Sequence, residues 1–181
     1  MDELTSLARA AGRGDSAALT RLVQQTQGDV WRLCAYLAGP DSADDLAQDT
    51  YLRAIPALRR FRGEAPVRVW LLTIARRACA AEIRARSRDR RLTARLAATR
   101  GMQSQPPAEP GSQAAADELT AALEPGRRAA FVLTQLLGCS YAEAAAICGC
   151  PVGTIRSRVA RAREDLDVMI TDPGNFLNAA H

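Results

Sequence analysis

The chain has 181 residues and a net charge of +4, and all 24 of its basic residues are arginine. This length suits one ordinary domain or two small ones, and no apolar run approaches the ~18 residues that a membrane-spanning helix needs. Five scattered cysteines without a preceding secretory signal predict a protein of the reducing cytosol rather than one held together by disulfides.

The positive charge is unevenly distributed along the chain. Residues 1–105 contain 18 arginines against 11 acidic residues, whereas residues 106–181 contain 6 arginines against 9 acidic residues. The first part is therefore expected to attract polyanions at long range, and the second to bind through the local placement of its side chains. Because arginine presents a planar, permanently charged guanidinium, these side chains suit bidentate contacts with phosphate or guanine.

Helices are predicted for most of residues 2–100, where alanine, leucine and arginine are frequent and apolar residues recur every three or four positions. The sequences GPDS (39–42) and FRGEAP (61–66) interrupt this pattern. After the second interruption, Pro66 suits a first helical turn. The buried face of the helix that follows is expected to contain Val67, Trp70, Leu71, Ile74 and Ala78.

The same helix is predicted to expose a stripe of arginines. Arg77, Arg84 and Arg88 are spaced by seven and four residues, which places them on one face. Such a stripe is often only a solvated surface, so its spacing alone leaves a nucleic-acid contact open. Residues 101–113, GMQSQPPAEPGSQ, then form a polar, proline-containing stretch that predicts a flexible linker.

Residues 117–170 contain the signals of a helix-turn-helix. Ser140 and Glu143 fit a capping box, Gly149 suits the left-handed cap that would end a short helix, and Pro151 suits the first turn of the next one. A short helix, a tight glycine turn and a longer helix are typical of this motif. The inner face of the short helix is expected to contain Tyr141, Ala144, Ala145 and Cys148.

At about 100° per residue, the last helix separates into an apolar and a polar face. Ile155, Val159, Ala162 and Leu166 share the side expected to be buried. The opposite side is small and hydrogen-bonding with cationic borders, which favours entry into the major groove of DNA over a membrane-surface helix with bulky apolar residues. The candidate DNA-contacting residues are Thr154, Arg156, Ser157, Arg158, Ala160, Arg161 and Arg163.

Cys139, Cys148 and Cys150 raise the alternative of a metal- or redox-responsive switch. A closed zinc site needs four ligands, the lone histidine is the last residue, and Cys148 is predicted to point inward. Small core residues are therefore the preferred interpretation, and no metal or cofactor is expected. No grouping of nucleophile, base and carboxylate is apparent, so an enzyme is not expected either.

Four segments resemble, in order, regions of bacterial sigma factors of the extracytoplasmic-function group. SADDLAQDTYLRAI (42–55) is similar to region 2.2, FRGEAPVRVWLLTIARR (61–77) to regions 2.3 and 2.4, ELTAALEPGRRAAFVLTQLLG (118–138) to region 4.1, and LLGCSYAEAAAICGCPVGTIRSRVARARE (136–164) to region 4.2. The resemblance implies an all-α fold with two small helical domains. The expected division is a region 2-like domain at 1–100, a flexible linker at 101–116, a region 4-like helix-turn-helix domain at 117–170 and a tail at 171–181.

The resemblance also implies a non-catalytic initiation factor that binds core RNA polymerase and directs it to promoters. The last helix would read duplex DNA at −35. Docking on the coiled coil of the largest polymerase subunit would fall to Asp45, Gln48, Asp49 and Arg53. Capture of melted −10 DNA, by aromatic stacking beside a cationic groove, would fall to Phe61, Arg62, Arg68, Arg76, Arg77 and Arg84, with Trp70 placed rather in the core.

Two further expectations concern partners and alternatives. An anti-sigma factor is a candidate partner in addition to polymerase and promoter DNA, and membrane insertion is not expected. An operator-binding helix-turn-helix regulator explains residues 136–168 equally well, but it leaves the first domain unexplained.

Overall fold

The computed structural model describes residues 2–98 and 119–171. Both ranges are built from helices and contain no strand, so the predicted all-α fold is confirmed for the described part of the chain. The predicted linker at 101–116 lies outside the described residues, and so does the predicted tail at 171–181 apart from Thr171.

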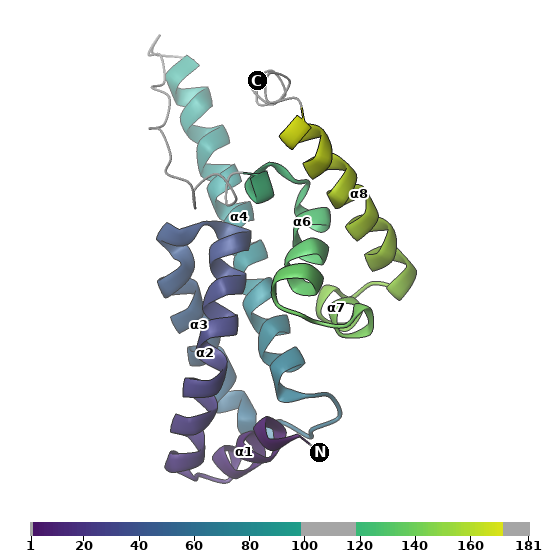
Figure 1. The fold of residues 1–181 in the computed structure, drawn as a ribbon. Coiled ribbons are helices and arrows are strands. Elements are labelled where there is room, and N and C mark those ends of the chain that lie inside the picture. Colours follow the sequence, from purple (N-terminus) through teal and green to yellow (C-terminus); the bar gives the residue numbers. More distant parts are fainter. Residues whose placement is uncertain (1, 99–118, 172–181) are drawn as a thin grey trace.

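The first domain surrounds its core with α1 (Glu3–Gly12), α2 (Ser16–Ala38), α3 (Ala43–Ala57) and α4 (Val67–Ala98), as Figure 1 shows. Short 3₁₀ helices at Pro40–Ser42 (η1) and Leu58–Arg60 (η2) flank α3. The carboxylates of Asp2 and Asp15 cap α1 and α2 by accepting the backbone N–H groups of Thr5 and Ala18. These caps satisfy amides that the first turn of a helix otherwise leaves unpaired.

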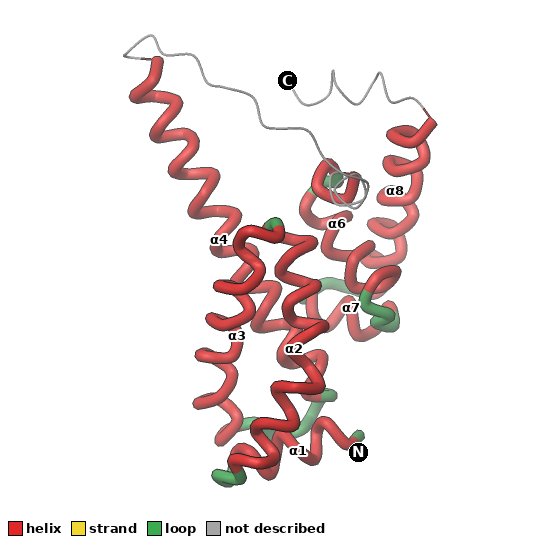
Figure 2. The backbone as a smooth tube through the Cα atoms, turned by 60° about the vertical axis from the view of Figure 1, so that its left-hand side comes forward, coloured by secondary structure: helices red, strands yellow, loops and turns green. Residues whose placement is uncertain are grey.

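Aliphatic side chains at the predicted spacing form the core of this domain. Its largest fully buried residues include Leu22, Leu33, Leu71 and Leu72. Val67 and Ala78 are buried as predicted, whereas Trp70 and Ile74 are half-buried at the edge of the core. Beyond this core, the C-terminal part of α4 extends past the other helices of the domain (Figures 1 and 2).

The second domain contains α6 (Pro125–Phe131), a π-helical turn at Val132–Leu136 (η3), α7 (Tyr141–Cys148) and α8 (Val152–Thr171). The capping box is confirmed, because Ser140 Oγ accepts from the Glu143 amide at 3.2 Å and the Glu143 carboxylate accepts from the Ser140 amide at 2.8 Å. Gly149 ends α7 with φ 65°, a backbone conformation that favours glycine.

The buried face of α7 differs from the prediction at three positions. Ala144 and Ala145 are buried as predicted, but Ile147 is buried too, Tyr141 is 37% exposed and Cys148 is only half-buried. Tyr141 is the first residue of α7, next to the capping residue Ser140. The inner face is therefore centred on Ala144 and Ile147.

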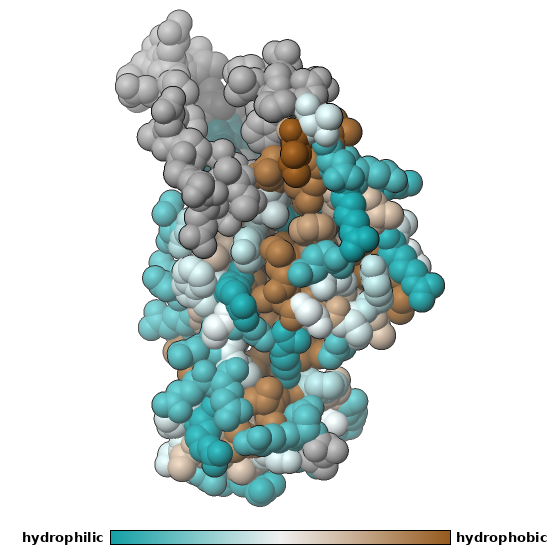
Figure 3. Space-filling view, in the orientation of Figure 1, coloured by the Kyte–Doolittle hydropathy of each residue, from teal (hydrophilic) through white to brown (hydrophobic). Residues whose placement is uncertain are grey.

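The two domains pack against each other through α4 and α7. Buried side chains of both domains belong to one continuous apolar cluster, in which Leu72 and Ala75 of α4 join Ala144 and Ile147 of α7. Figure 3 shows apolar surface near the centre of the molecule, between the charged surfaces of the two domains. This packing decides which polar residues of α4 face the second domain.

Candidate nucleic-acid interface

Helix α8 buries the face that its sequence predicts. Ile155 and Ala162 have no exposed surface, Val159 is 2% exposed, and Leu166 is half-buried further along the helix. These side chains pack where α8 contacts α6 and α7. Because turning the helix would expose buried apolar side chains to water, the packing holds its polar strip outward.

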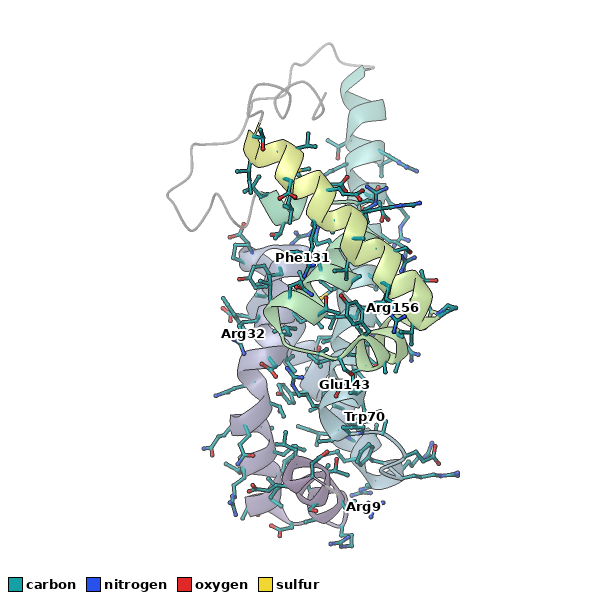
Figure 4. All side chains as sticks on the ribbon, turned by 45° about the vertical axis from the view of Figure 1, so that its right-hand side comes forward. Arg9, Arg32, Trp70, Phe131, Glu143 and Arg156 are labelled. Carbon is teal, nitrogen blue, oxygen red and sulfur yellow. The ribbon has the colours of Figure 1, made fainter. Side chains whose placement is uncertain are left out.

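The outward strip of α8 leaves two arginines available. Arg156 and Arg161 are exposed and form no hydrogen bond or ion pair with any residue of the two described ranges. Figure 4 shows Arg156 near the N-terminal end of α8. Exposed Ala160 lies beside Arg161. Because its side chain is only a methyl group, this part of α8 can come close to the base edges in a DNA groove. The Ser157 hydroxyl is also exposed and donates locally to the Thr154 carbonyl at 3.0 Å.

The two border arginines of α8 lie in different surroundings. Arg163 is exposed and donates to Gln135 Oε1 at 2.6 Å. Arg158 is half-buried, with its Nη1 atom 3.9 Å from Cys150 Sγ, and it lines a cavity of about 330 Å³ together with Arg76. Arg158 thus lies at the junction of the two domains, away from the outer border where the helical wheel predicts it.

Arg68 and Arg76 on α4 point toward the second domain. Arg68 Nε donates to Asp29 Oδ2 at 2.6 Å and its Nη2 donates to the Leu137 carbonyl at 2.5 Å. Arg76 Nε donates to the Ile147 carbonyl at 2.9 Å, near the C-terminus of α7. Carbonyls at the end of a helix have no partner within it, so Arg76 satisfies a group that the second domain would otherwise leave to water.

The surroundings of Arg68 keep it firmly charged. Burial acts to lower the pKa of Arg68, but the hydrogen bond and negative charge of Asp29 outweigh it, and the pKa is raised. In this arrangement the guanidinium groups of Arg68 and Arg76 are both occupied by protein partners. Neither can bind DNA with those groups until the domains separate at this junction.

An aromatic pair is formed by Phe61, in the segment before α4, and Trp70 on α4. The ring centroids of Phe61 and Trp70 are 5.2 Å apart, with an angle of 44° between the ring planes. Both residues are half-buried against the core, so each keeps part of its ring at the surface. The arrangement combines the predicted core role of Trp70 with a stacking surface for unpaired bases.

Three other predicted −10 residues are exposed in the loop before α4 and along the helix. Arg62 is in the loop before α4 and lies 3.8 Å from Glu64 in a solvent-exposed ion pair, a type that contributes little to stability. Arg77 and Arg84 are exposed on α4 and form no hydrogen bond or ion pair with the described residues. The structure thus exposes Arg62, Arg77 and Arg84, keeps part of the Phe61 ring at the surface, and directs Arg68 and Arg76 to the domain junction.

The residues predicted to bind polymerase lie on one side of α3. Asp45 and Gln48 are exposed, while Asp49 and Arg53 form an ion pair one turn apart at 2.8 Å. Leu46, Thr50 and Ala54 hold the opposite side of α3 against the core. The predicted polar strip is therefore exposed at Asp45, Gln48 and Arg53 and half-buried at Asp49.

Comparison with known proteins decides the family. The family model described as Sigma-70 region 2 matches residues 22–89, and Sigma-70, region 4 matches residues 113–166. The chain is 47% identical over 173 residues to the ECF RNA polymerase sigma factor SigC of Mycobacterium tuberculosis, covering 91% of this chain and 90% of the relative. It belongs to the extracytoplasmic-function (ECF) sigma factors.

Other ECF sigma factors show the same relationship. EcfG of Rhodopseudomonas palustris is 39% identical over 135 residues, covering 72% of each chain. Among solved structures, the sigma factor RpoE in complex with the anti-sigma factor NepR from Bartonella quintana gives a TM-score of 0.69 at 29% identity, over 84% of this chain and 96% of RpoE. CnrH in complex with the cytosolic domain of CnrY gives 0.72 at 27% identity, over 94% and 98%.

As an ECF sigma factor, the protein is a transcription initiation factor. It binds core RNA polymerase and directs it to specific promoters by reading −35 duplex DNA and capturing melted −10 DNA. An operator-binding regulator, the alternative for the second domain alone, does not account for the region 2 match at residues 22–89.

This sigma factor has apolar surface residues near the α3 strip that sequence reasoning missed. Leu52 is 66% exposed and Ile55 is 39% exposed on α3. Trp31 on α2 is 41% exposed and donates its ring N–H to Asp44 Oδ1 at 2.7 Å, beside a groove of about 490 Å³ that Gln48 also lines. Leu52 could have been found from the sequence, because the buried residues of α3 recur every four positions and Leu52 is not in that series.

The cysteines of the sigma factor occupy packing positions. Cys34, Cys79 and Cys139 are buried, while Cys148 and Cys150 are half-buried. Burial raises the pKa of the Cys139 and Cys148 thiols. Within residues 2–98 and 119–171, no three His, Cys, Asp or Glu side chains are grouped so as to hold a metal ion, and no helix has the length and apolar character to cross a membrane.

Proposed function

We propose that α8, α4 and α3 of this sigma factor divide promoter recognition among them. Helix α8 reads the −35 duplex, the N-terminal end of α4 with Phe61 captures −10 bases, and α3 docks on the coiled coil of the largest polymerase subunit. The observation that carries the proposal is the geometry of α8, where Ile155 and Val159 are buried while Arg156 and Arg161 are exposed without a hydrogen bond or ion pair to the described residues.

In the −35 duplex, Arg161 and Ser157 contact base edges in the major groove. Arg156 and Arg163 contact phosphates on its walls, and Thr154 lies near the N-terminal end of the same surface. Ala160 offers only a methyl group, so its contribution is limited to an apolar contact such as that with the thymine methyl. Arg158 joins this surface only after it leaves the cavity at the domain junction.

At the −10 element, unpaired bases stack on the Phe61 and Trp70 rings while Arg62 and Arg77 contact the backbone. Unstacking costs a few kcal/mol per step, and stacking on an aromatic side chain returns about 1–3 kcal/mol per base. Arg68 and Arg76 add to this site when the second domain moves away. The protein thereby stabilises an opened strand without consuming chemical energy, as a non-catalytic subunit.

Polymerase docking combines charge and apolar contact on α3. Asp45 and Gln48 supply polar contacts, and the Asp49–Arg53 ion pair is available for exchange with charges on the partner. Exposed Leu52 supplies apolar area whose burial on docking is favourable. This combination supports the docking surface that the resemblance implies.

Two of the similar solved structures are complexes with the anti-sigma factor NepR and with the cytosolic domain of CnrY. By this similarity, an anti-sigma factor is a candidate partner of the present chain. Because bacterial polymerase and chromosomal DNA are in the cytoplasm, the protein acts there.

Reconstituted transcription with purified core polymerase tests the proposal. The wild-type protein is expected to direct initiation from mapped start sites that share −35 and −10 sequences. Ser157→Ala and Arg161→Ala are expected to lose this preference for the −35 sequence, while Ser16→Ala, an exposed change far from α8, is the control. Wild-type initiation by both α8 variants would remove the assignment of the reading helix.

A further inference from the structure

The cavity at the domain junction concentrates positive charge. It has a volume of about 330 Å³, and residues of both domains line it. Arg76 comes from α4, Arg128 from α6 and Arg158 from α8, and none of the described residues that line the cavity is acidic. A cavity of this size suits a small molecule, and three guanidinium groups select for one that carries several negative charges.

The protein does not neutralise these three arginines. Arg76 donates to the Ile147 carbonyl at 2.9 Å, and Arg128 donates to the Leu37 carbonyl at 3.4 Å. Carbonyl oxygens satisfy hydrogen-bond donors but carry no formal charge. Within residues 2–98 and 119–171, neither these two arginines nor Arg158 forms an ion pair. Their positive charges are therefore left without a direct counter-charge.

Arg128 has a buried donor without a partner. Its Nε atom is buried and has no hydrogen-bond partner in the part of the chain that the structure describes. Burial lowers the pKa of Arg128, and the negative charge of Glu124 only partly offsets this effect. Buried polar groups are normally paired, and a buried charge without a counter-charge costs free energy. An anion in the cavity would supply negative charge where the protein supplies little.

Glu124 does not fill this role. Its carboxylate caps α6 by accepting the amides of Gly126 at 2.9 Å and Arg127 at 3.0 Å. Arg158 packs against the same turn, because a Cβ at Gly126 would lie only 3.2 Å from Arg158 Cζ. Glu124 attracts Arg128 and Arg158, but within the described range 119–171 it forms an ion pair with neither.

We propose that this cavity binds a small polyphosphate anion, held between the two domains by Arg76, Arg128 and Arg158. Phosphate oxygens match the fork of guanidinium donors, and charge-assisted hydrogen bonds of this kind are the strong ones. Leu37 and Ile83 also line the cavity, so an apolar body attached to the phosphates can pack beside them. The inference does not depend on the proposed function, because it concerns the packed domains before Arg76 and Arg158 become available to DNA.

The ligand is expected to hold the domains together. Arg76 belongs to the first domain, whereas Arg128 and Arg158 belong to the second, so only the packed arrangement presents all three. A ligand that binds one state at 100 times its Kd favours that state by about 100-fold. Cys139 is buried and contacts Arg68 of the first domain, so its alkylation is expected to slow when the ligand is bound.

Calorimetric titration of the full chain with pyrophosphate and, separately, with ADP at constant ionic strength tests the site. Saturable one-to-one binding of either compound supports the inference, and the tighter binder identifies free pyrophosphate or a nucleotide as the source of the phosphates. Arg158→Gln removes a charge, and Arg128→Lys keeps the charge but removes the fork of donors. Each is expected to weaken binding by about tenfold or more, as loss of a hydrogen bond to a charged group predicts.

Arg90→Gln is the matched control, because it removes the same charge from an exposed position on α4 that does not line the cavity. It is expected to bind both compounds as the wild type does, and circular dichroism verifies that all variants keep their helical content. Wild-type protein that binds neither compound saturably overturns the inference. Equal weakening by Arg90→Gln and Arg158→Gln does so too, as does binding that leaves the alkylation rate of Cys139 unchanged.

Discussion

Helices α4 and α8 carry most of the arginines predicted to contact DNA, but they display them differently. In α8, Arg156 and Arg161 have no hydrogen-bond or ion-pair partner among residues 2–98 and 119–171, and the helix packs mainly against α6 and α7 of its own small domain. Helix α4 contacts both domains, and it divides its arginines between the surface, as at Arg77, and the domain junction, as at Arg68 and Arg76. A helix that packs mainly within one domain shows its polar face to solvent, whereas a helix that packs against two domains uses part of that face to join them.

The largest expected effect on stability comes from shortening a buried side chain that holds α8 in its domain. Ile155→Ala is expected to lower the free energy of unfolding by about 2–5 kcal/mol, since it leaves a cavity beside Val159 and Ala162. Val152→Ala, at the exposed start of α8, is expected to change it by less than about 0.5 kcal/mol. Denaturant unfolding of the full chain measures both, and equal losses would show that α8 is not held by its buried face.

Some of the difference between the two helices was predictable from sequence. The capping box at Ser140, the glycine cap at Gly149 and the buried Ile155 depend on residues within a few positions of one another. Local hydrogen bonds and a helical period determine such features before any other domain is present. The outward direction of Arg161 follows from them.

The role of α4 at the domain junction was not predictable in this way. Arg68 meets the Leu137 carbonyl 69 residues away, and Arg76 meets the Ile147 carbonyl 71 residues away. Nothing in the local pattern specifies how two domains joined by a long connection align. The same reason explains why the wheel placed Arg158 on a DNA-facing border, although its guanidinium lies in the cavity beside Arg76.

The Arg68→Ala/Arg76→Ala variant tests whether these two side chains hold α4 against the second domain. Loss of hydrogen bonds to charged donors costs about 1.5–3 kcal/mol, which shifts the equilibrium toward separated domains by roughly ten- to hundredfold. Cys139 reports this opening, since it is 5% exposed and Arg68 Nη1 lies 3.6 Å from its sulfur. Alkylation of Cys139 is therefore expected to accelerate.

The pKa of the Cys139 thiol adds to the expected increase in its alkylation rate. Burial raises the pKa of its thiol, so exposure lowers the pKa toward the ordinary value and increases the reactive thiolate as well as access. Arg77→Ala is the control on the other face of α4, and it is expected to leave the rate unchanged. An Arg68→Ala/Arg76→Ala variant with wild-type alkylation would show that apolar packing alone holds the domains together.

The exposed arginines of α8 give a smaller effect, which for Arg161 is specific to DNA sequence. Arg161→Ala is expected to cost about 1–3 kcal/mol of −35 recognition and to reduce discrimination at one base pair. Arg163 already donates to Gln135, so Arg163→Ala is expected to weaken cognate and altered −35 sequences alike. Holoenzyme binding to a set of −35 substitutions separates these outcomes, and uniform weakening by Arg161→Ala would assign that residue to phosphate.

The smallest expected effect concerns the N-terminal cap of α7, the helix that precedes α8. Ser140→Ala removes the cap of α7 and is expected to lower the free energy of unfolding by about 1 kcal/mol. The Ser140 amide and hydroxyl hold the pKa of Glu143 below its ordinary value of 4.5. Because the folded-state pKa is lowered, this contribution to stability is present above pH 4.5 and is lost as pH falls through the folded-state value.

Unfolding of wild type, Ser140→Ala and Glu143→Gln across this acidic range measures the contribution of the cap. Wild type is expected to lose more stability on acidification than Glu143→Gln, whose side chain cannot ionise. Alkylation of Cys139, measured near neutral pH, is expected to change little in Ser140→Ala if the cap acts only within the second domain. Strong acceleration of Cys139 alkylation in Ser140→Ala would instead show that the stability of α7 affects how tightly the domains pack at α4. The contrast between α8, which packs mainly in one domain, and α4, which packs against two, would then no longer hold.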